Sequence, residues 1–460
     1  MSETPLGEAR IGIVGTGHRA AMFVKGIVAR PPATVVAICE PNRVRAASYN
    51  ELLVSLGAPK VPVYQPDDFK NMLATEKVDM VVITCVDALH DLYIVPALEA
   101  GVRVLTEKPM TTDADKCRRI LETVQRTGRH LTVTFNYRYN PIHELVKRTI
   151  AEGKIGKVLS VHFEWLLDTV HGADYFRRWH RQKTNSGGLM VHKSGHHFDL
   201  VNWWIDSEPE IVAGLGKLGF YGDKAGNEHG WAKDYERARG SQAAKDDPFA
   251  INLEADKELK ALYVDAEGED GYFRDQNVFA PGIGIEDDMS VMVGTLALVL
   301  HINKRCCKVR YANGVNMTYH LTAYSPWEGY NVVFNGSLGR LELKVVESQY
   351  RLPTTSAEGF IHGVSALPNA GDATLMLQRL WEKPEYLPVV YDHAGHGGGD
   401  KRMLSVLFGP LPGEAAETGD ASKQSANERD GAMALAVGLL ANESFKTGKF
   451  LSVKDLNLPL

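Results

Sequence analysis

A glycine-rich turn near the start of the chain limits the fold more than any other feature. Residues 11–14 form a short apolar run, and the turn and a helix-favouring segment follow it directly. The first two glycines of a G-x-G-x-x-G/A pattern let the backbone approach a pyrophosphate, and the third small residue lets a helix pack against the strand. The pattern predicts a dinucleotide site, and a tight turn without a ligand is the alternative. The expected cofactor contacts are Gly15, Thr16, Gly17, His18 and Arg19, followed by the small residue Ala20.

Apolar strand-like runs alternate with helical patterns from residue 10 to residue 135. Such alternation is typical of a parallel sheet covered by helices on both faces. The expected strands are 11–14, 35–39, 61–64, 80–84, 102–105 and 130–135, and the expected helices are 20–29, 43–56, 66–75, 91–100 and 113–127. We therefore predict an α/β, doubly wound Rossmann domain over residues 1–138.

The pattern changes after Pro141 to fewer, longer strands with a two-residue periodicity. This change predicts an α+β second domain, residues 139–460, with a large open mixed or antiparallel sheet. Expected strands are 158–167, 210–218, 315–324 and 339–346, with helices at 196–205 and 432–445. A long polar excursion, 219–285, carries a helical piece near 254–262 and is expected to be a lid or an oligomer contact. Residues 294–308 look like an insertion.

Composition favours small-molecule chemistry. The formal net charge is −6 over 460 residues, and basic and acidic residues are interspersed. This pattern does not indicate binding to nucleic acid or to an anionic membrane. The five cysteines are odd in number and show no C-x-x-C spacing, which fits a reducing compartment. No apolar run is long enough to span a bilayer, and no secretory signal is visible, so we expect a cytoplasmic protein.

Glu40 ends the second expected strand, about twenty-five residues after the glycine turn. A carboxylate there can accept hydrogen bonds from both adenosine ribose hydroxyls and would repel a 2′-phosphate, so NAD is favoured. Arg43 lies close by and leaves NADP open. A plain helix-capping acid is the alternative role for Glu40.

Two further segments lie at the carboxyl edge of the expected sheet, where open α/β sheets bind ligands. The first carries Thr84, Asp87 and His90, and the second is Glu107-Lys108-Pro109. A desolvated lysine beside a positively charged nicotinamide has a lowered pKa, which suits proton exchange with an alcohol. A surface lysine capping a turn is the alternative.

Together with the glycine turn, these segments resemble the Gfo/Idh/MocA oxidoreductase family over most of the chain. The resemblance implies that Thr84, Asp87 and His90 line the nicotinamide side. It also implies that Lys108 contacts the reacting sugar hydroxyl and that Glu107 contacts the cofactor ribose. A homodimer or homotetramer is implied as well.

The segment 179–199 resembles the family's second catalytic segment, with two departures. Trp179 is followed by His180 where the family has an arginine, and the family's aspartate is absent. Trp179 and His180 are expected near the cofactor. Counting back from a His-x-x-Asp pattern places the family's catalytic pair on His192 and His196. Counting forward from the glycines places it on Lys193 and His197.

Helix periodicity narrows the choice of register. His192, His196, Asp199 and Trp203 recur at i, i+4, i+7 and i+11 and share one face of a continuous helix. We expect His196 to be the general base, Asp199 to support the helix, and Lys193 or His192 to replace the missing acid. A zinc pair on the His-x-x-x-His spacing is the rival, but no glutamate follows His192 and no third ligand is evident, so we expect no metal.

Mixed aromatic and cationic residues before this segment suit a sugar, whose ring stacks on aromatics while its hydroxyls meet polar groups. A solvated loop is the alternative. Late in the chain, a glycine turn flanked by His396 and Asp400 resembles one seen in sugar-handling members, including NAD-dependent glycosidase branches. The expected substrate contacts are Lys108, His171, Tyr175, Arg178, His180, Lys193, His196, His197, His396 and Asp400.

These features predict an NAD-dependent enzyme that transfers hydride between nicotinamide and a ring hydroxyl, at C3, of a sugar or glycoside. A redox-neutral NAD-dependent glycosidase, which oxidises, eliminates, hydrates and reduces, is the alternative. A cofactor-binding regulator without catalysis is disfavoured because Lys108 and the His192–His197 cluster are all present.

Overall fold

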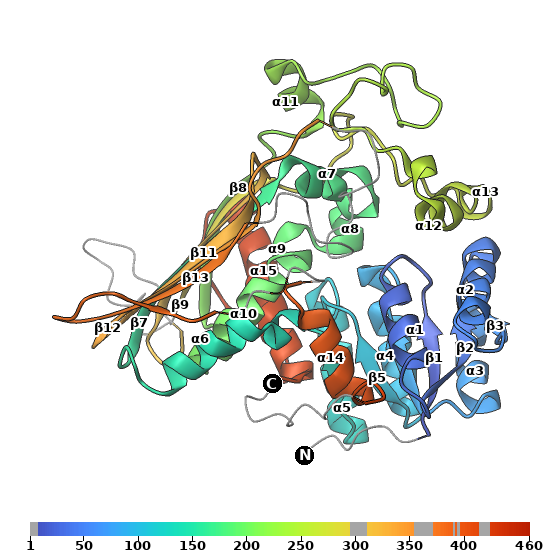
Figure 1. Cartoon of the computed structure of the whole chain (residues 1–460), viewed down its shortest axis with the longest axis horizontal. Coiled ribbons are helices and arrows are strands. Elements are labelled where there is room, and N and C mark those ends of the chain that lie inside the picture. Colours follow the sequence, from blue (N-terminus) through green and yellow to red (C-terminus); the bar gives the residue numbers. More distant parts are fainter. Residues whose placement is uncertain (1–7, 295–310, 354–370, 390–391, 393–395, 414–423) are drawn as a thin grey trace.

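Two sheets lie side by side in the computed structural model (Figure 1). The structure describes residues 8–294, 311–353, 371–389, 392, 396–413 and 424–460. Residues 295–310, which hold all but the first position of the expected insertion, lie outside this part of the chain. No helix among the described residues is long and apolar enough to cross a membrane.

The first sheet has seven strands in the order β15-β6-β5-β4-β1-β2-β3. Its parallel strands are β1 Arg10–Val14, β2 Thr34–Cys39, β3 Val63–Tyr64, β4 Met80–Ile83, β5 Arg103–Thr106 and β6 Leu131–Val133. The connecting helices are α1 Ala20–Val28, α2 Arg43–Ser55, α3 Phe69–Thr75, α4 His90–Glu99 and α5 Ala114–Thr127. The predicted doubly wound parallel sheet is confirmed.

Burial on both faces explains why these strands are apolar throughout. Along β4, Met80 and Val82 enter a core with α1 and α2, whereas Val81 and Ile83 enter the core that α3, α4 and α5 share. The seventh strand of this sheet, β15 Ala426–Asn427, lies near the C-terminal end of the chain and pairs antiparallel with β6. Helix α14, Gly399–Phe408, also packs on α1. The C-terminal segment therefore completes the Rossmann sheet.

The second sheet has nine strands in the order β14-β13-β12-β11-β7-β10-β9-β8-β16. It is mixed, because β7 and β10 pair in parallel and the other neighbours pair antiparallel. This confirms the predicted fold class. The strands are β7 Val158–Asp168, β8 Ile211–Lys217, β9 Asp288–Gly294, β10 Asn316–Ser325, β11 Glu328–Gly336, β12 Gly339–Ser348, β13 Ala373–Arg379, β14 Glu385–Leu387 and β16 Leu451–Ser452.

Helices of the second domain pack on one another and on this sheet, and α15 lies on β8, α9 and α10. They are α6 Pro141–Ala151, α7 Thr169–Arg177, α8 Lys183–Ser186, α9 Leu189–His192, α10 Gly195–Ile205 and α15 Glu428–Thr447. In the excursion lie α11 Gly222–His229, α12 Lys257–Leu259, a π-helical turn Lys260–Val264 and α13 Glu267–Asp270. The excursion reaches from α7 to the outer end of α2 (Figure 1).

The prediction of one continuous helix through His192 and His196 is wrong. Helix α9 ends at His192 and α10 begins at Gly195. The His192 carbonyl, which would accept the His196 amide in a continuous helix, instead accepts Lys108 Nζ at 3.2 Å. The His196 amide donates to the Lys193 carbonyl. The two histidines therefore do not share one helical face.

Candidate active site

The glycine turn fits a dinucleotide pyrophosphate. Gly15 has a φ of +80°, and a Cβ there would lie 2.6 Å from the Cα of Cys85, so only glycine is accommodated. A Cβ on Gly17 would meet only the Tyr263 hydroxyl, at 3.8 Å, so the space above the turn is open. The Arg19 side chain does not cap helix α1, and the Tyr263 hydroxyl accepts from the His18 amide just before the helix, so an anion at this N-terminus would lie beside Tyr263.

Glu40 lies at the end of β2 and points to the glycine turn. Its carboxylate accepts hydrogen bonds from the Thr16 amide at 2.8 Å and the Asn42 amide at 2.9 Å. Arg45, which the sequence did not single out, lies 3.5 Å away. Arg43 instead is largely exposed and pairs with Glu269 of the excursion. The carboxylate is thus held at the edge where an adenosine ribose would lie.

Two residues expected near the nicotinamide brace the backbone around it. The Thr84 hydroxyl donates to the Gly15 carbonyl at 2.8 Å. The His90 ring nitrogens lie 2.9 Å from the Pro109 carbonyl and 3.2 Å from the Cys85 carbonyl. Both side chains therefore tie β4 to the glycine turn and to the segment after β5, and the structure does not bring them to Lys108.

Arg19 joins three distant segments of the chain. Its Nε donates to Glu107 at 2.8 Å, and its two terminal nitrogens donate to the Asp400 carboxylate at 3.2 and 3.0 Å. Asp400 also bonds His396 Nδ1 at 2.8 Å and accepts from Asn136. Although burial opposes it, the Arg19 charge holds the pKa of Asp400 well below its usual range. This network fixes Glu107 beside the glycine turn.

Lys108 reaches from the edge of the Rossmann sheet to α9 of the second domain. Its Nζ lies 3.3 Å from His192 Nε2, and His192 Nδ1 lies 2.5 Å from an Asp87 carboxylate oxygen. Burial lowers the pKa of Lys108 to about 8. Burial, and then the neighbouring Lys108 charge, lowers the pKa of His192 well below its usual value. A neutral imidazole that donates to Asp87 can accept the Lys108 ammonium at its other nitrogen.

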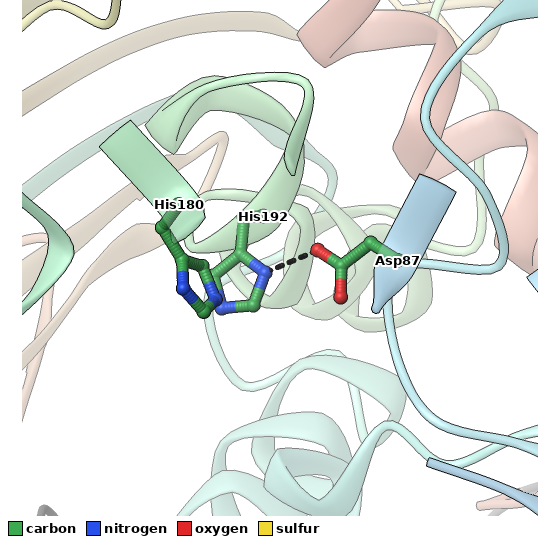
Figure 2. Close-up of side chains that lie close together, drawn as sticks. All are labelled: Asp87, His180 and His192. Atoms are coloured by element: carbon green, nitrogen blue, oxygen red, sulfur yellow. Dashed lines mark hydrogen bonds and ion pairs between the residues drawn. The ribbon is translucent and has the colours of Figure 1, made fainter. Parts of the chain in front are cut away.

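Figure 2 shows His180 and His192 side by side, with Asp87 on the far side of His192. The His180 ring stacks on Trp179 with centroids 3.5 Å apart and meets the His192 ring edge-on at 4.2 Å. Each of the three labelled residues offers a metal-ligand atom within 4.8 Å of the others. Because both nitrogens of His192 already have partners, a metal ion bound to His192 would have to displace the Lys108 ammonium or break the hydrogen bond to Asp87. The expectation of no metal stays a prediction.

The other candidates of this segment lie among aromatic rings. His196 stacks on Tyr137 at 4.5 Å, and its buried Nδ1 has no hydrogen-bond partner among the described residues. His197 stacks on Trp165 and bonds the Tyr319 hydroxyl at 2.7 Å. The Lys193 ammonium lies 4.5 Å from the centre of the Trp165 ring. Of the four candidates, His192 is the one that hydrogen-bonds Lys108.

Helix α7 carries the expected sugar contacts as a buried helix and not as a solvated loop. His171 bonds Glu328 at 2.6 Å through Nδ1 and the Tyr175 hydroxyl at 3.1 Å through Nε2. Arg178 lies over the Tyr175 ring at 5.4 Å. The side chains thus form one connected polar and aromatic surface.

Tyr137 is the central residue that sequence reasoning missed. Its ring contacts His196, His396 and Trp165, and its hydroxyl accepts from Lys193 at 3.4 Å. The sequence could have indicated Tyr137 by its position just after β6, at the same sheet edge as Lys108. Glu328, which bonds His171, lies on β11 in a segment that carried no motif.

Comparison with known proteins identifies the family. The model of the oxidoreductase family with an NAD-binding Rossmann fold matches residues 9–135, and its C-terminal alpha/beta domain matches residues 147–263. An oxidoreductase of Bacillus subtilis strain 168, YteT, is 35% identical over 366 residues, which cover 76% of each chain. The chain belongs to the Gfo/Idh/MocA oxidoreductase family. The resemblance seen in the sequence is confirmed, and its Rossmann domain is of the NAD-binding type.

Other proteins that are similar to this chain carry more specific names. Inositol 2-dehydrogenase of Corynebacterium glutamicum strain R is 30% identical over 200 residues, which cover 43% of this chain and 54% of that relative. A levoglucosan dehydrogenase in complex with NADH and levoglucosan matches 97% of this chain and 99% of its own, at 15% identity and a TM-score of 0.60. The last match concerns the fold alone.

Proposed function

We propose that this protein oxidises a ring hydroxyl, at C3, of a sugar or glycoside and transfers the hydride to NAD. The observation that carries the proposal is the chain of side chains from Lys108 through His192 to Asp87. With its pKa lowered to about 8, Lys108 can take a proton from an alcohol near neutral pH. The name of the similar inositol 2-dehydrogenase supports a polyol or sugar substrate.

In this proposal NAD supplies the hydride acceptor, and the chain supplies position and proton transfer. Lys108, with His196, takes the hydroxyl proton. His192 and Asp87 hold the Lys108 ammonium in one orientation and replace the family's aspartate. Burial lowers the pKa of His196 well below its usual value, so its imidazole is neutral, and its Nδ1, which has no partner among the described residues, is open to a hydrogen bond with the sugar hydroxyl. The sugar contacts are His171, Tyr175, Arg178, His180, Lys193, His197, His396 and Asp400.

We also propose NAD in preference to NADP. Glu40 is held as an acceptor at the ribose edge by two backbone amides, and a carboxylate there repels a 2′-phosphate. Arg43 is paired with Glu269, so its charge is already balanced. Binding of NADH and NADPH to the purified protein, followed by fluorescence, tests this preference. A tighter NADPH complex would contradict it.

A substrate panel tests the proposed reaction. Methyl glycosides, free aldoses and myo-inositol are incubated with enzyme and NAD, and NADH absorbance is recorded. Lys108→Ala and His196→Ala are each expected to lower kcat by about a hundredfold or more, which is the usual rate enhancement from a positioned general acid or base. Lys157→Ala, an exposed lysine, is the matched control and should leave kcat unchanged. The assignment fails if both catalytic variants stay within about threefold of the parent.

A redox-neutral glycosidase is the second candidate. Oxidation at C3 acidifies the C2 hydrogen; loss of that proton expels the aglycone from C1; water then adds, and the hydride returns to the C3 ketone. The excursion that covers the edge of the cofactor site favours this cycle, because the same NAD would be used repeatedly. A chromogenic glycoside separates the two reactions. Net oxidation accumulates NADH in step with product, whereas the glycosidase releases aglycone with no net NADH.

We propose that the chain acts as a homodimer or homotetramer in the cytoplasm. The support is the resemblance to the family and the wide, open nine-stranded sheet. Light scattering of the purified protein measures the molar mass, and a monomeric value would contradict the assembly.

A further inference from the structure

The part of the excursion from residue 253 to residue 271, here called the cofactor clamp, lies between the two domains. On one side the adjoining Arg274 forms two hydrogen bonds, of 2.7 and 3.0 Å, with the Asp174 carboxylate of α7. On the other side Leu262 is buried in the core that α1 and α2 form with the Rossmann sheet. The clamp is therefore fixed to the substrate domain and packed on the cofactor domain.

Its central residue touches the glycine turn. The Tyr263 hydroxyl accepts a hydrogen bond from the His18 amide at 3.1 Å, in the stretch between Gly17 and the start of α1. Glu258 lies 3.5 Å from His18 Nδ1. These contacts bring a phenol and a carboxylate of the second domain to the mouth of the pyrophosphate site.

The C-terminal end of the clamp closes the ribose edge. Asn42 Nδ2 donates to the Ala266 carbonyl and to the Asp270 carboxylate, each at 2.9 Å. The Arg43 amide and Nε both donate to Glu269, at 2.6 and 3.0 Å. Asn42 in turn donates its amide to Glu40, the expected ribose acceptor. The clamp is thus bonded to the residues that surround the cofactor's ribose site.

We infer that the cofactor clamp retains NAD between turnovers, and this inference rests on the proposed NAD-dependent function. Release of a dinucleotide requires both the pyrophosphate end and the ribose end of its site to open. Here both ends are bonded to one segment, so they open only when that segment leaves α1 and α2. NADH held in this way can return its hydride to the C3 ketone after the aglycone has left, as the second candidate function requires. The clamp therefore favours redox-neutral turnover.

The rate of NADH release tests the clamp without any substrate. The full-length protein is loaded with NADH and mixed with excess NAD, and the loss of bound NADH fluorescence is followed. Glu269→Arg places two like charges together, and we expect it to speed release at least about fivefold, since the pair also orders the clamp's end. Adding Arg43→Glu restores an opposite-charge pair and should bring release back toward the parent rate.

Glu228→Arg is the matched control, because it makes the same charge change on the exposed surface of α11. It should leave release unchanged. The inference is overturned if the parent releases NADH as fast as Glu269→Arg, or if the control has the same effect. Retained NADH with no turnover of any sugar would contradict the proposed function but not the clamp. Fast release with active turnover would contradict the clamp alone.

Discussion

Lys108 Nζ lies 3.3 Å from His192 Nε2, across the boundary between the Rossmann domain and the second domain. The same ammonium donates to the His192 carbonyl at 3.2 Å. One lysine thus fixes both the ring and the backbone of its partner. The contact gives the lysine of the Rossmann domain a polar partner in the second domain.

The pH dependence of sugar oxidation should report Lys108. Because burial lowers the pKa of Lys108 to about 8, the side chain is an ammonium below that pH and an amine above it. Only the amine accepts a proton, so kcat/KM should rise with pH, reach half of its maximum at or below pH 8, since the nicotinamide charge lowers the pKa further, and level off above that midpoint. Lys108→Arg should abolish this rise. A profile that is flat in the parent enzyme would contradict the role.

Replacing His192 should separate orientation from substrate binding. His192→Asn removes the ring that links Lys108 to Asp87, and we expect kcat to fall about tenfold to a hundredfold with KM nearly unchanged. His130→Asn, on an exposed histidine at β6, is the control. If KM rises while kcat is kept, His192 binds the sugar and does not position Lys108.

The buried ion pair between Arg138 and Asp199 should matter for stability. Arg138 donates to Asp199 at 2.8 and 2.6 Å, and both side chains are almost fully buried. Asp199→Ala leaves a buried cation short of a partner, so the free energy of unfolding should fall by about 3 kcal/mol. Urea denaturation measures it. The control Asp115→Ala breaks an exposed pair with Arg118 and should cost less than about 1 kcal/mol. Equal effects would contradict the account.

A divalent metal should inhibit the enzyme, not activate it. Zinc bound by Asp87, His180 and His192 would break one of the two hydrogen bonds that connect Lys108 through His192 to Asp87. We expect a chelator to leave kcat unchanged and added zinc to lower it, with His180→Ala weakening the inhibition. Loss of activity with the chelator, restored by a metal, would show that the triad is a metal site and would refute the expected absence of one.

The sequence predicted those parts of the site that depend on neighbouring residues. The glycine turn and Glu107-Lys108-Pro109 each follow a strand, so their place at the sheet edge follows from local pattern. The break between α9 and α10 could not be predicted from local pattern, because it comes with a hydrogen bond from Lys108, a residue far away in the chain. Tyr137 and the pairing of β15 with β6 likewise depend on tertiary packing. The sequence indicated a helical piece near 254–262 but not its contact with α2, since the polar bonds between them involve single residues.

The fate of the carbinol hydrogen tests the central claim most directly. A glycoside that turns over is prepared with deuterium at C3, and separately at C2 and C4, and the cofactor from a single turnover is analysed by mass spectrometry. The account predicts that the reduced cofactor gains one mass unit from the C3-labelled glycoside and none from the other two. A cofactor that stays unlabelled with the C3-labelled glycoside would contradict it.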